Sequence, residues 1–489
     1  MPKAVLIMTD TQRWDMVGCY RDTGLRTPSL DRLAAQGIRF ERAYCTQPVC
    51  QPARAALFTG QYPHSCGSWS NAMGIADNTR TVGRRLMDQG IHTAYIGKWH
   101  LDGGDYFGLG QAADGWDPAY WYDMRNYLEE LTPEQRILSR QKSTMSEGGV
   151  APEFTFAHRC ADRARAFLEK HAKEDFFLVV SFDEPHDPFL CPEPYASMYK
   201  DYVFPCSANA NDDLQGKPAH QKIWAQACGD EIGNFPAQYF FGCNSFVDME
   251  IGRIIDQIET FAPDALILYT SDHGEMLGSH GLMEKGPNAY DEITRIPFIA
   301  KGPGISAGKV SSMPLSHISV APTIMEWFNC PVPSVFDGQS ILPVLQGAPE
   351  YSNTVFIEFG RFEVDHDGFG GLQLMRAAFD GRYKLVINLL ATDELYDLQD
   401  DPGELKNLIE DDQCAEVRDC LHDRILAEMY RTRDPFRGYY WRDRPWRKSV
   451  SPLTWHDTGL TRQRDDQPYE KRQLEYYTGL AIEQTVRKI

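Results

Sequence analysis

Short apolar runs alternate with amphipathic helical patterns through much of this chain, and that alternation narrows the possible folds to a small group. Residues 29–36, closed by Gly37, and residues 246–261 carry apolar side chains at helical spacing. Strands that alternate with helices form a parallel sheet wrapped by helices. We therefore predict an α/β fold, a mostly parallel sheet flanked by helices, with strands at residues 4–8, 93–96, 176–182 and 265–270.

The length of 489 residues exceeds what one hydrophobic core usually supports, so a large domain with a smaller partner is expected. We assign residues 1–350 to the large domain and 351–434 to a C-terminal α+β subdomain built on an antiparallel sheet. Residues 375–379 and 383–388 form its predicted β-hairpin. The tail, 435–489, is too aromatic for a disordered end. It is expected to pack on the body or on a neighbouring subunit of a homo-oligomer.

A strongly acidic composition argues against nucleic acid or an anionic membrane as a partner. The formal net charge is -20 at pH 7, whereas a phosphate backbone is bound through clustered Lys and Arg. The apolar run 4–8 is too short for a secretory signal, and no apolar run is long enough to span a bilayer. The twelve cysteines include no Cys-x-x-Cys pair and are expected to be reduced thiols. These features predict a cytoplasmic protein.

Polar residues follow each predicted strand at the point where the strand ends. Asp10 comes after the first strand and Asp272 after the fourth, while Lys98 and His100 follow the second and His186 follows the third. Open α/β sheets bind their ligands at the carboxyl ends of the strands. We expect these side chains to form one site. Two carboxylates with a neighbouring imidazole would bind a hard or borderline divalent cation there.

The pentapeptide Cys50-Gln51-Pro52-Ala53-Arg54 stands at the start of a short predicted helix that ends at Gly60. Pro52 suits the first helical turn and Gly60 suits the helix end. The unpaired N–H groups and the positive end of the dipole at a helix N-terminus favour an anion. A cysteine alone is usually a small buried apolar side chain. In this setting it indicates a site for an oxyanion.

This pentapeptide resembles the Cys-x-Pro-x-Arg recognition sequence of the formylglycine-dependent sulfatases, a family of the alkaline phosphatase superfamily, and the chain is most similar to its cytosolic bacterial members. The resemblance extends from residue 4 to the segment 394–408. It implies an alkaline-phosphatase-like fold and a sulfuric ester hydrolase. It also implies that a formylglycine-generating enzyme oxidises Cys50 to an aldehyde. One oxygen of the aldehyde hydrate can attack sulfur, and the other can then release sulfate.

The same resemblance implies roles for the residues of the predicted site. Arg54 would hold the oxidised side chain, and Lys98 and Lys285 would contact the sulfate oxygens. His186, with Lys285 as a second candidate, would protonate the leaving alcohol. His100 would deprotonate the remaining hydroxyl group.

One divalent cation is also implied, with calcium as the expected ion. Its implied ligands are Asp10, Thr11, the oxidised side chain of Cys50, Asp272 and His273. Thr11 departs from the family, in which an aspartate or an amide follows the first aspartate. The identity of the metal therefore stays open, and manganese is the alternative because it accepts imidazole nitrogen at least as well as calcium does.

The expected substrate is a small sulfate monoester, a sulfated carbohydrate. The aromatic segment 102–127 would either stack on a sugar ring or act as a packing insert. The polar loop 359–371 would either bind hydroxyl groups or connect two elements. Asn71, Arg361 and His366 are the expected substrate-binding residues. Two alternatives stay open: a phosphonate monoester or phosphodiester hydrolase on the same scaffold, and a protein that binds a sulfated ligand without turnover.

Overall fold

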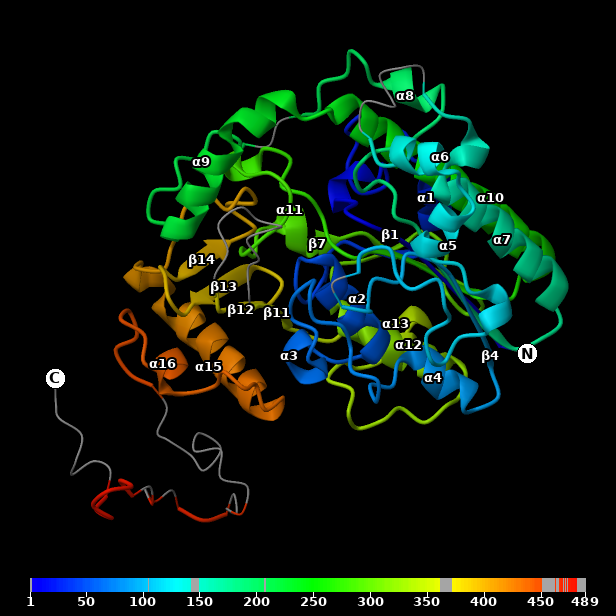
Figure 1. The fold of residues 1–489 in the computed structure, drawn as a ribbon. Coiled ribbons are helices and arrows are strands. Elements are labelled where there is room, and N and C mark those ends of the chain that lie inside the picture. The colour runs from blue at the N-terminus through cyan, green and yellow to red at the C-terminus, as the bar shows by residue number, and fades with distance from the viewer. Residues whose placement is uncertain are drawn as a thin grey trace.

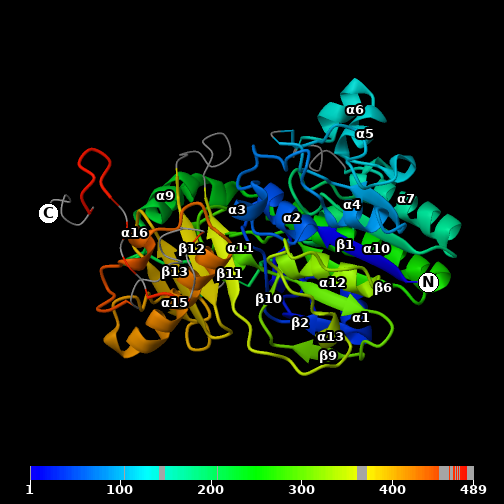
Figure 2. The ribbon, with the colours of Figure 1, turned by 90° about the horizontal axis from the view of Figure 1, so that it is seen from below.

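The computed structural model describes residues 2–103, 105–141, 149–205, 208–360 and 372–450, and beyond these only 462, 466–468, 470, 472 and 474–481. The chain forms a large α/β part and a smaller C-terminal part that lie side by side (Figures 1 and 2). None of the helices in the described ranges is long and apolar enough to cross a membrane.

A seven-stranded sheet in the order β4-β5-β1-β6-β8-β2-β9 forms the centre of the large part. Its four adjacent parallel strands confirm the predicted ones, and β1 lies in their middle, hydrogen-bonded to β5 on one side and β6 on the other. β8 runs antiparallel to both of its neighbours, so the sheet is mostly parallel. The strands are β1 Lys3–Thr9, β2 Ile38–Phe40, β4 His92–Gly97, β5 Phe176–Ser181, β6 Leu266–Ser271, β8 Phe298–Lys301 and β9 Lys309–Ser311.

Helices cover both faces of this sheet, which explains why its parallel strands are apolar throughout. Side chains alternate along a strand, so Val5 and Ile7 of β1 pack into one hydrophobic core while Leu6 and Met8 pack into another. The first core lies under α1, α7 and α10, and the second lies under α2, α4 and α12 (Figure 1). These helices are α1 Pro28–Gln36, α2 Cys50–Thr59, α4 Val82–Met87, α7 Phe156–His171, α10 Ala237–Phe261 and α12 Val320–Trp327.

The remaining elements of the large part are short, apart from α9. A three-stranded sheet joins the central sheet to the C-terminal part; its strands are β3 Ala43–Tyr44, β7 Arg295–Ile296 and β10 Leu315–Ser316. The other helices are α3 Pro63–Cys66, α5 Met124–Glu129, α6 Pro133–Leu138, α8 Tyr195–Met198, α9 Ala219–Asn234, α11 Asp291–Thr294 and α13 Leu342–Leu345.

Helix α2 begins at Cys50 itself, so the cysteine is its first residue. Val49 before it is extended, and Pro52 falls in the first turn, where a backbone N–H is not needed. Gly60 ends the helix in the left-handed conformation with φ +66°. A side chain at position 60 would approach the Phe336 ring to 3.0 Å, so both the backbone and the packing favour glycine. All ten residues of α2 are buried.

The C-terminal part is an α+β unit, as predicted. Its four-stranded antiparallel sheet runs in the order β11-β12-β13-β14, and the β12–β13 hairpin is the predicted one. Trp441 and Trp446 of the predicted tail pack into the same core as Leu421 and Ile425 of α15, so this stretch packs on its own chain. The domain limits at residues 350 and 434 stay predictions. The elements are β11 Val355–Phe359, β12 Met375–Phe379, β13 Tyr383–Asn388, β14 Glu394–Asp397, α15 Ala415–Arg431 and α16 Tyr439–Arg442.

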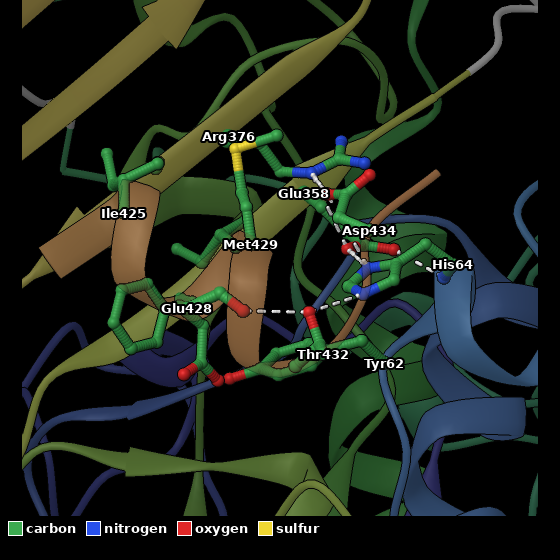
Figure 3. A pocket seen from close by; sticks show the side chains of 12 residues that line it. Tyr62, His64, Glu358, Arg376, Ile425, Glu428, Met429, Thr432 and Asp434 are labelled. Atoms are coloured by element: carbon green, nitrogen blue, oxygen red, sulfur yellow. Dashed lines mark hydrogen bonds and ion pairs between the residues drawn. The ribbon is translucent and has the colours of Figure 1, made fainter. Parts of the chain in front are cut away.

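A buried charge cluster joins the two parts just beyond α2 (Figure 3). His64 of α3 donates through its backbone N–H to Glu358 Oε1 at 2.8 Å, and its Nδ1 is bonded to Glu358 Oε2. The Thr432 hydroxyl donates to a backbone carbonyl, so it accepts from His64 Nε2–H at 2.9 Å. Burial opposes the charge, but Glu358 raises the pKa of His64 above its ordinary value. Arg376 pairs with Asp434 at 2.6 Å and completes a neutral network.

We expect His64→Gln to lower the free energy of unfolding by about 3 kcal/mol in acid, because the buried Glu358 carboxylate loses its cationic partner. Glutamine keeps a donor for Thr432 and removes the Nδ1 contact. Since the folded-state pKa of His64 is raised, its contribution is fully present below the unfolded pKa of about 6.5 and is lost as pH rises through the folded value. Denaturant unfolding of both proteins across this range measures the effect.

His220→Gln is the matched control. His220 is also buried, but burial lowers its pKa, so its contribution to stability is lost as pH falls rather than as it rises. An effect of His64→Gln that is equal in acid and in alkali would contradict an imidazolium at position 64.

Candidate active site

Four neighbouring strands end at one edge of the sheet, and each is followed by a polar residue. Asp10, Lys98 and Asp272 follow β1, β4 and β6, and all three are fully buried. Cys50, at the start of α2, faces this edge. The structure brings together the predicted residues Asp10, Thr11, Cys50, Arg54, Lys98, His100, His186, Asp272, His273 and Lys285.

The thiol of Cys50 is surrounded by charged and titratable groups. Its Sγ lies 3.1 Å from His273 Nε2 and 3.7 Å from Asp10 Oδ1. Burial and the Asp10 carboxylate act to raise the pKa of the thiol, but Lys285, Lys98 and His273 outweigh them and hold it well below its ordinary value. The surroundings of residue 50 therefore favour negative charge on its side chain.

The guanidinium of Arg54 joins the two buried carboxylates. Nη2 donates to Asp10 Oδ2 at 2.9 Å, and Nε donates to Asp272 Oδ2 at 3.0 Å. Nη1 donates to the Lys98 carbonyl oxygen at 2.8 Å and to the Ser181 hydroxyl at 2.7 Å. Within the described residues these four groups, and not residue 50, accept the hydrogen bonds of Arg54. Arg54 therefore positions the carboxylates, and its contact with the oxidised side chain of residue 50 stays a prediction.

The donor atoms of Asp10, Cys50, Asp272 and His273 lie within 4.8 Å of one another. Nδ1–H of His273 donates to the Gly274 carbonyl oxygen at 2.8 Å, so the lone pair of Nε2 is directed into this group. Burial and the Asp10 carboxylate raise the pKa of Asp272 to about 7, which means that the two carboxylates lack enough positive charge in this space. Two carboxylates and an imidazole suit a hard or borderline divalent cation, so the residues fit the implied metal.

Thr11 lies at these donors, while the next residue turns away. The Thr11 backbone takes φ +63°; its N–H donates to Asp272 Oδ1 at 3.1 Å and its hydroxyl donates to Asp10 Oδ1 at 2.7 Å. Gln12 instead donates to Asn244 Oδ1 at 2.6 Å in a separate buried network. The amide of Gln12 therefore does not replace the acidic or amide residue that position 11 lacks. A role for Thr11 as a metal ligand stays a prediction.

Lys98 is a fixed cation between two carboxylates. Its Nζ lies 2.8 Å from Asp10 Oδ2 and 2.9 Å from Asp183 Oδ1. It also donates to the Tyr106 hydroxyl at 2.8 Å, which in turn donates to Asp183 at 2.6 Å. Burial opposes the charge, but Asp10 and Asp183 raise the pKa of Lys98 above its ordinary value.

His186 and Lys285 form a proton-carrying pair. His186 Nδ1 lies 2.8 Å from Asp187 Oδ1, and Nε2 lies 3.3 Å from Lys285 Nζ, where only one of the two nitrogens can donate. Burial, Lys285 and Lys98 act to lower the pKa of His186, but nearby carboxylates, among them Asp187, Asp10 and Asp183, raise it to about 10. The pair therefore holds a proton close to residue 50 at neutral pH.

His100 and Asn71 lie on other sides of residue 50. His100 takes φ +53° after β4 and lies close enough to Cys50 for the thiol to affect the pKa of its ring. Burial lowers the pKa of His100, so its ring is neutral and can accept a proton. Asn71 Oδ1 accepts from the Gln51 backbone N–H at 3.1 Å, which places this side chain against the first turn of α2.

The sequence prediction did not identify Asp183 or Asp187 as part of the site. Asp183 directly follows the predicted strand 176–182, which is the signal that identified Asp10. The prediction instead took its site residue, His186, from the Glu184-Pro185-His186 segment beyond it. Glu184 Oε1 instead accepts from a backbone N–H at 2.9 Å, and burial raises the pKa of Glu184 to about 8.

The aromatic residues of the segment 102–127 have two different locations. Tyr106 lies in the site, whereas Trp116, Trp121, Tyr122 and Tyr127 are buried in the two cores and act as packing residues.

Arg361 and His366, two of the expected substrate-binding residues, lie outside the described residues. The described site gathers several cationic groups beside its carboxylates despite the acidity of the whole chain. The cationic groups include Arg54, Lys98 and Lys285, and the carboxylates include Asp10, Asp183, Asp187 and Asp272. A divalent cation would add positive charge, which favours an anionic ester.

Comparison with known proteins identifies family models and relatives that match this chain. A family model described as Sulfatase matches residues 2–330, and one described as N-sulphoglucosamine sulphohydrolase, C-terminal, matches residues 278–431. The chain is 44% identical to a protein of Escherichia coli K12 named uncharacterized sulfatase YidJ, over 98% of this chain and 97% of the relative. It is 24% identical to the N-acetylglucosamine-6-O-sulfatase of Bacteroides thetaiotaomicron, over 89% and 88%.

The fold has solved counterparts as well. The phosphonate monoester hydrolase of Agrobacterium radiobacter superposes with a TM-score of 0.74 at 23% identity, over 88% of this chain and 96% of the other. Fold and site together define a member of the alkaline phosphatase superfamily. The chain belongs to the sulfatase family, and it is a sulfuric ester hydrolase. The predicted fold class and family are both confirmed.

We expect Asp272→Asn to weaken binding of the divalent cation, because one of the two carboxylate ligands is lost. Replacing a residue that hydrogen-bonds to a metal ligand typically weakens metal binding by about 10- to 100-fold, and replacing a direct ligand should weaken it at least as much. Metal content after dialysis, and the rise in melting temperature on adding the cation to chelator-treated protein, measure the change.

Glu184→Gln is the control for this experiment. Glu184 is a buried carboxyl group at the same edge of the sheet, but its raised pKa of about 8 leaves it mostly uncharged at neutral pH, so its replacement should keep the cation. Equal metal content in Asp272→Asn and the unsubstituted protein would contradict the assignment.

Proposed function

We propose that this enzyme hydrolyses a small sulfate monoester, a sulfated carbohydrate, through a formylglycine formed from Cys50. The observation that carries the proposal is the setting of Cys50. Its side chain, in a Cys-x-Pro-x-Arg motif, faces three candidate metal ligands and the cations Lys98 and Lys285. Such a pocket stabilises an oxyanion on residue 50 and on the substrate.

Oxidation of Cys50 by a formylglycine-generating enzyme explains why the motif has a cysteine rather than a serine. The hydrated aldehyde has two hydroxyl groups on one carbon. One can take the sulfuryl group from the ester, and loss of the proton from the other releases sulfate and restores the aldehyde. A serine hydroxyl could perform only the first of these steps.

One divalent cation bound by Asp10, Asp272, His273 and the oxidised residue 50 would supply Lewis acid stabilisation of negative charge on oxygen. Calcium is the proposed ion, and manganese is the alternative because of the imidazole ligand. Thr11 is a further candidate ligand through its hydroxyl.

The protein's own residues support the proton transfers in this scheme. The Lys285–His186 pair would donate a proton to the leaving alcohol oxygen, since it holds one at neutral pH. His100, which is neutral and lies beside residue 50, would accept the proton of the second hydroxyl group. Lys98 would bind a sulfate oxygen, and Arg54 would keep the carboxylates in place.

A sulfated sugar is proposed because a relative is named N-acetylglucosamine-6-O-sulfatase. Asn71, Arg361 and His366 remain the proposed substrate contacts. Phosphonate ester hydrolysis and binding without turnover are the outcomes that would replace this proposal. A cytoplasmic location, a homo-oligomer and the modifying enzyme as a partner remain proposals too.

We expect the peptide that contains Cys50 to show the mass of a formylglycine, in which one oxygen has replaced the sulfur and two hydrogens. Cys50→Ala should abolish turnover, and Cys50→Ser should allow at most one turnover because it cannot release sulfate. Mass spectrometry and burst kinetics on a panel of small sulfated sugars measure both.

Cys45→Ser is the control, since Cys45 is buried nearby but its thiol is hydrogen-bonded to a backbone carbonyl outside the site. Sustained turnover by Cys50→Ser, or faster hydrolysis of a phosphonate ester than of any sulfate ester, would contradict the proposal.

We expect His186→Ala to reduce kcat by about 10²- to 10⁴-fold on alkyl sulfates and much less on aryl sulfates, whose leaving groups need no proton. Asp187→Asn should move the alkaline limb of the pH profile to lower pH, because the Asp187 carboxylate helps raise the pKa of His186 to about 10. Steady-state rates against pH for the two ester types measure both effects. Equal losses on alkyl and aryl sulfates would show that His186 is not the proton donor.

A further inference from the structure

His92, His171 and Glu174 form a cluster at the opposite edge of the sheet from the active site. His92 is the first residue of β4, His171 is the last residue of α7, and Glu174 lies between α7 and β5. Their donor atoms lie within 4.8 Å of one another. Six residues of extended chain separate His92 from Lys98, which is about 20 Å at ~3.3 Å per residue, so this cluster is separate from the catalytic residues.

Both imidazole rings are directed at the same carboxylate oxygen. Nδ1 of His171 lies 2.8 Å from Glu174 Oε2, and Nδ1 of His92 lies 3.2 Å from it. The rings meet nearly at right angles, with their centroids 4.6 Å apart. Three potential ligand atoms, one from β4 and two from the end of α7 and the connection after it, therefore converge on one point.

The outer nitrogen of each ring has its own partner. His92 Nε2 lies 2.8 Å from Asp117 Oδ2, and His171 Nε2 lies 2.6 Å from the Tyr120 hydroxyl. An ionised carboxylate only accepts, so His92 Nε2 carries the hydrogen, and in the neutral ring Nδ1 has a lone pair. That lone pair faces the Glu174 carboxylate, and the contact is favourable only if a second proton or a cation lies there.

Metal-binding histidines show this arrangement, with the outer ring nitrogen held by a carboxylate or another oxygen. The His64 cluster differs, because Arg376 lies beside its carboxylates, 3.8 Å from Glu358 and 2.6 Å from Asp434. Among the described residues, the ion pairs of Glu174 are with the two histidines and not with a lysine or an arginine. The Glu174 side chain is 50% exposed, so an ion can reach the cluster from solvent.

We propose that His92 Nδ1, His171 Nδ1 and the Glu174 carboxylate bind a second divalent metal ion of the zinc type. Two imidazoles and one carboxylate are a donor set that zinc prefers, and calcium does not. Three protein ligands leave one position for water. The ion would bind ligands from the edge strand β4, from the end of α7 and from the connection before β5, and would hold these segments together. It would be a structural ion, distinct from the catalytic cation.

Zinc titration of chelator-treated protein that has been resaturated with calcium tests this proposal. We expect His92→Gln to bind one equivalent of zinc fewer than the unsubstituted protein, because glutamine keeps a donor for Asp117 and removes the Nδ1 ligand. Glu174→Gln should lose the same equivalent, and because Glu174 is half exposed this variant should fold normally. Zinc should raise the melting temperature of the unsubstituted protein and of neither variant.

His158→Gln is the matched control. His158 also lies in α7, and its Nδ1 faces a carboxylate at 2.8 Å, but Arg253 supplies a cation to the same carboxylate. The His158→Gln variant should therefore bind as much zinc as the unsubstituted protein. Sulfate ester hydrolysis should be equal in all four proteins, so a failure of the proposed function would not affect this test. Equal zinc stoichiometry in the unsubstituted protein, His92→Gln and Glu174→Gln would overturn the proposal.

Discussion

The Arg54 guanidinium contacts the ends of all four parallel strands at once. Its partners are Asp10 after β1, Asp272 after β6, Ser181 at the end of β5 and the carbonyl of Lys98 after β4. Arg54 lies one helical turn beyond Cys50 in α2, so the same interaction fixes the position of residue 50 over the sheet. A buried charge is stable only when it is paired and fully hydrogen-bonded, and here the sheet itself supplies the partners.

This arrangement explains how a strongly acidic chain can receive an anionic substrate. Arg54 and Lys98 pair with the carboxylates of the site and offset part of their charge, and a divalent cation bound there would offset the rest. Buried charges interact strongly because little water screens them. The local field around residue 50 therefore depends on a few fixed groups and only weakly on the surface charge. Lys285, Lys98 and His273 all act to hold the pKa of Cys50 below its ordinary value.

The sequence predicted the parts of the site that follow from strand order and from a motif. Asp10 and Asp272 could be placed because parallel strands end at the same edge, and Cys50 because of its motif. Two partners of Lys98, Asp183 and Tyr106, were not predicted, since they meet only through the packing of separate loops. The four hydrogen bonds that Arg54 makes at the strand ends were not predicted either, and its expected contact with the oxidised side chain of residue 50 stays a prediction. Patterns in the chain locate strand ends well, but they do not show which side chains pair across the resulting edge.

The complete burial of α2 determines whether the proposed oxidation of Cys50 must come before or after folding. Cys50 is 1% exposed, and it lies in a helix whose ten residues are all buried. Another enzyme could not bind this segment in the native protein, because a recognition site of several residues would have to leave the core. The proposed oxidation of Cys50 would therefore have to take place while the chain is still unfolded. Maturation would then compete in time with folding, and a molecule that folds first would keep an unmodified thiol permanently.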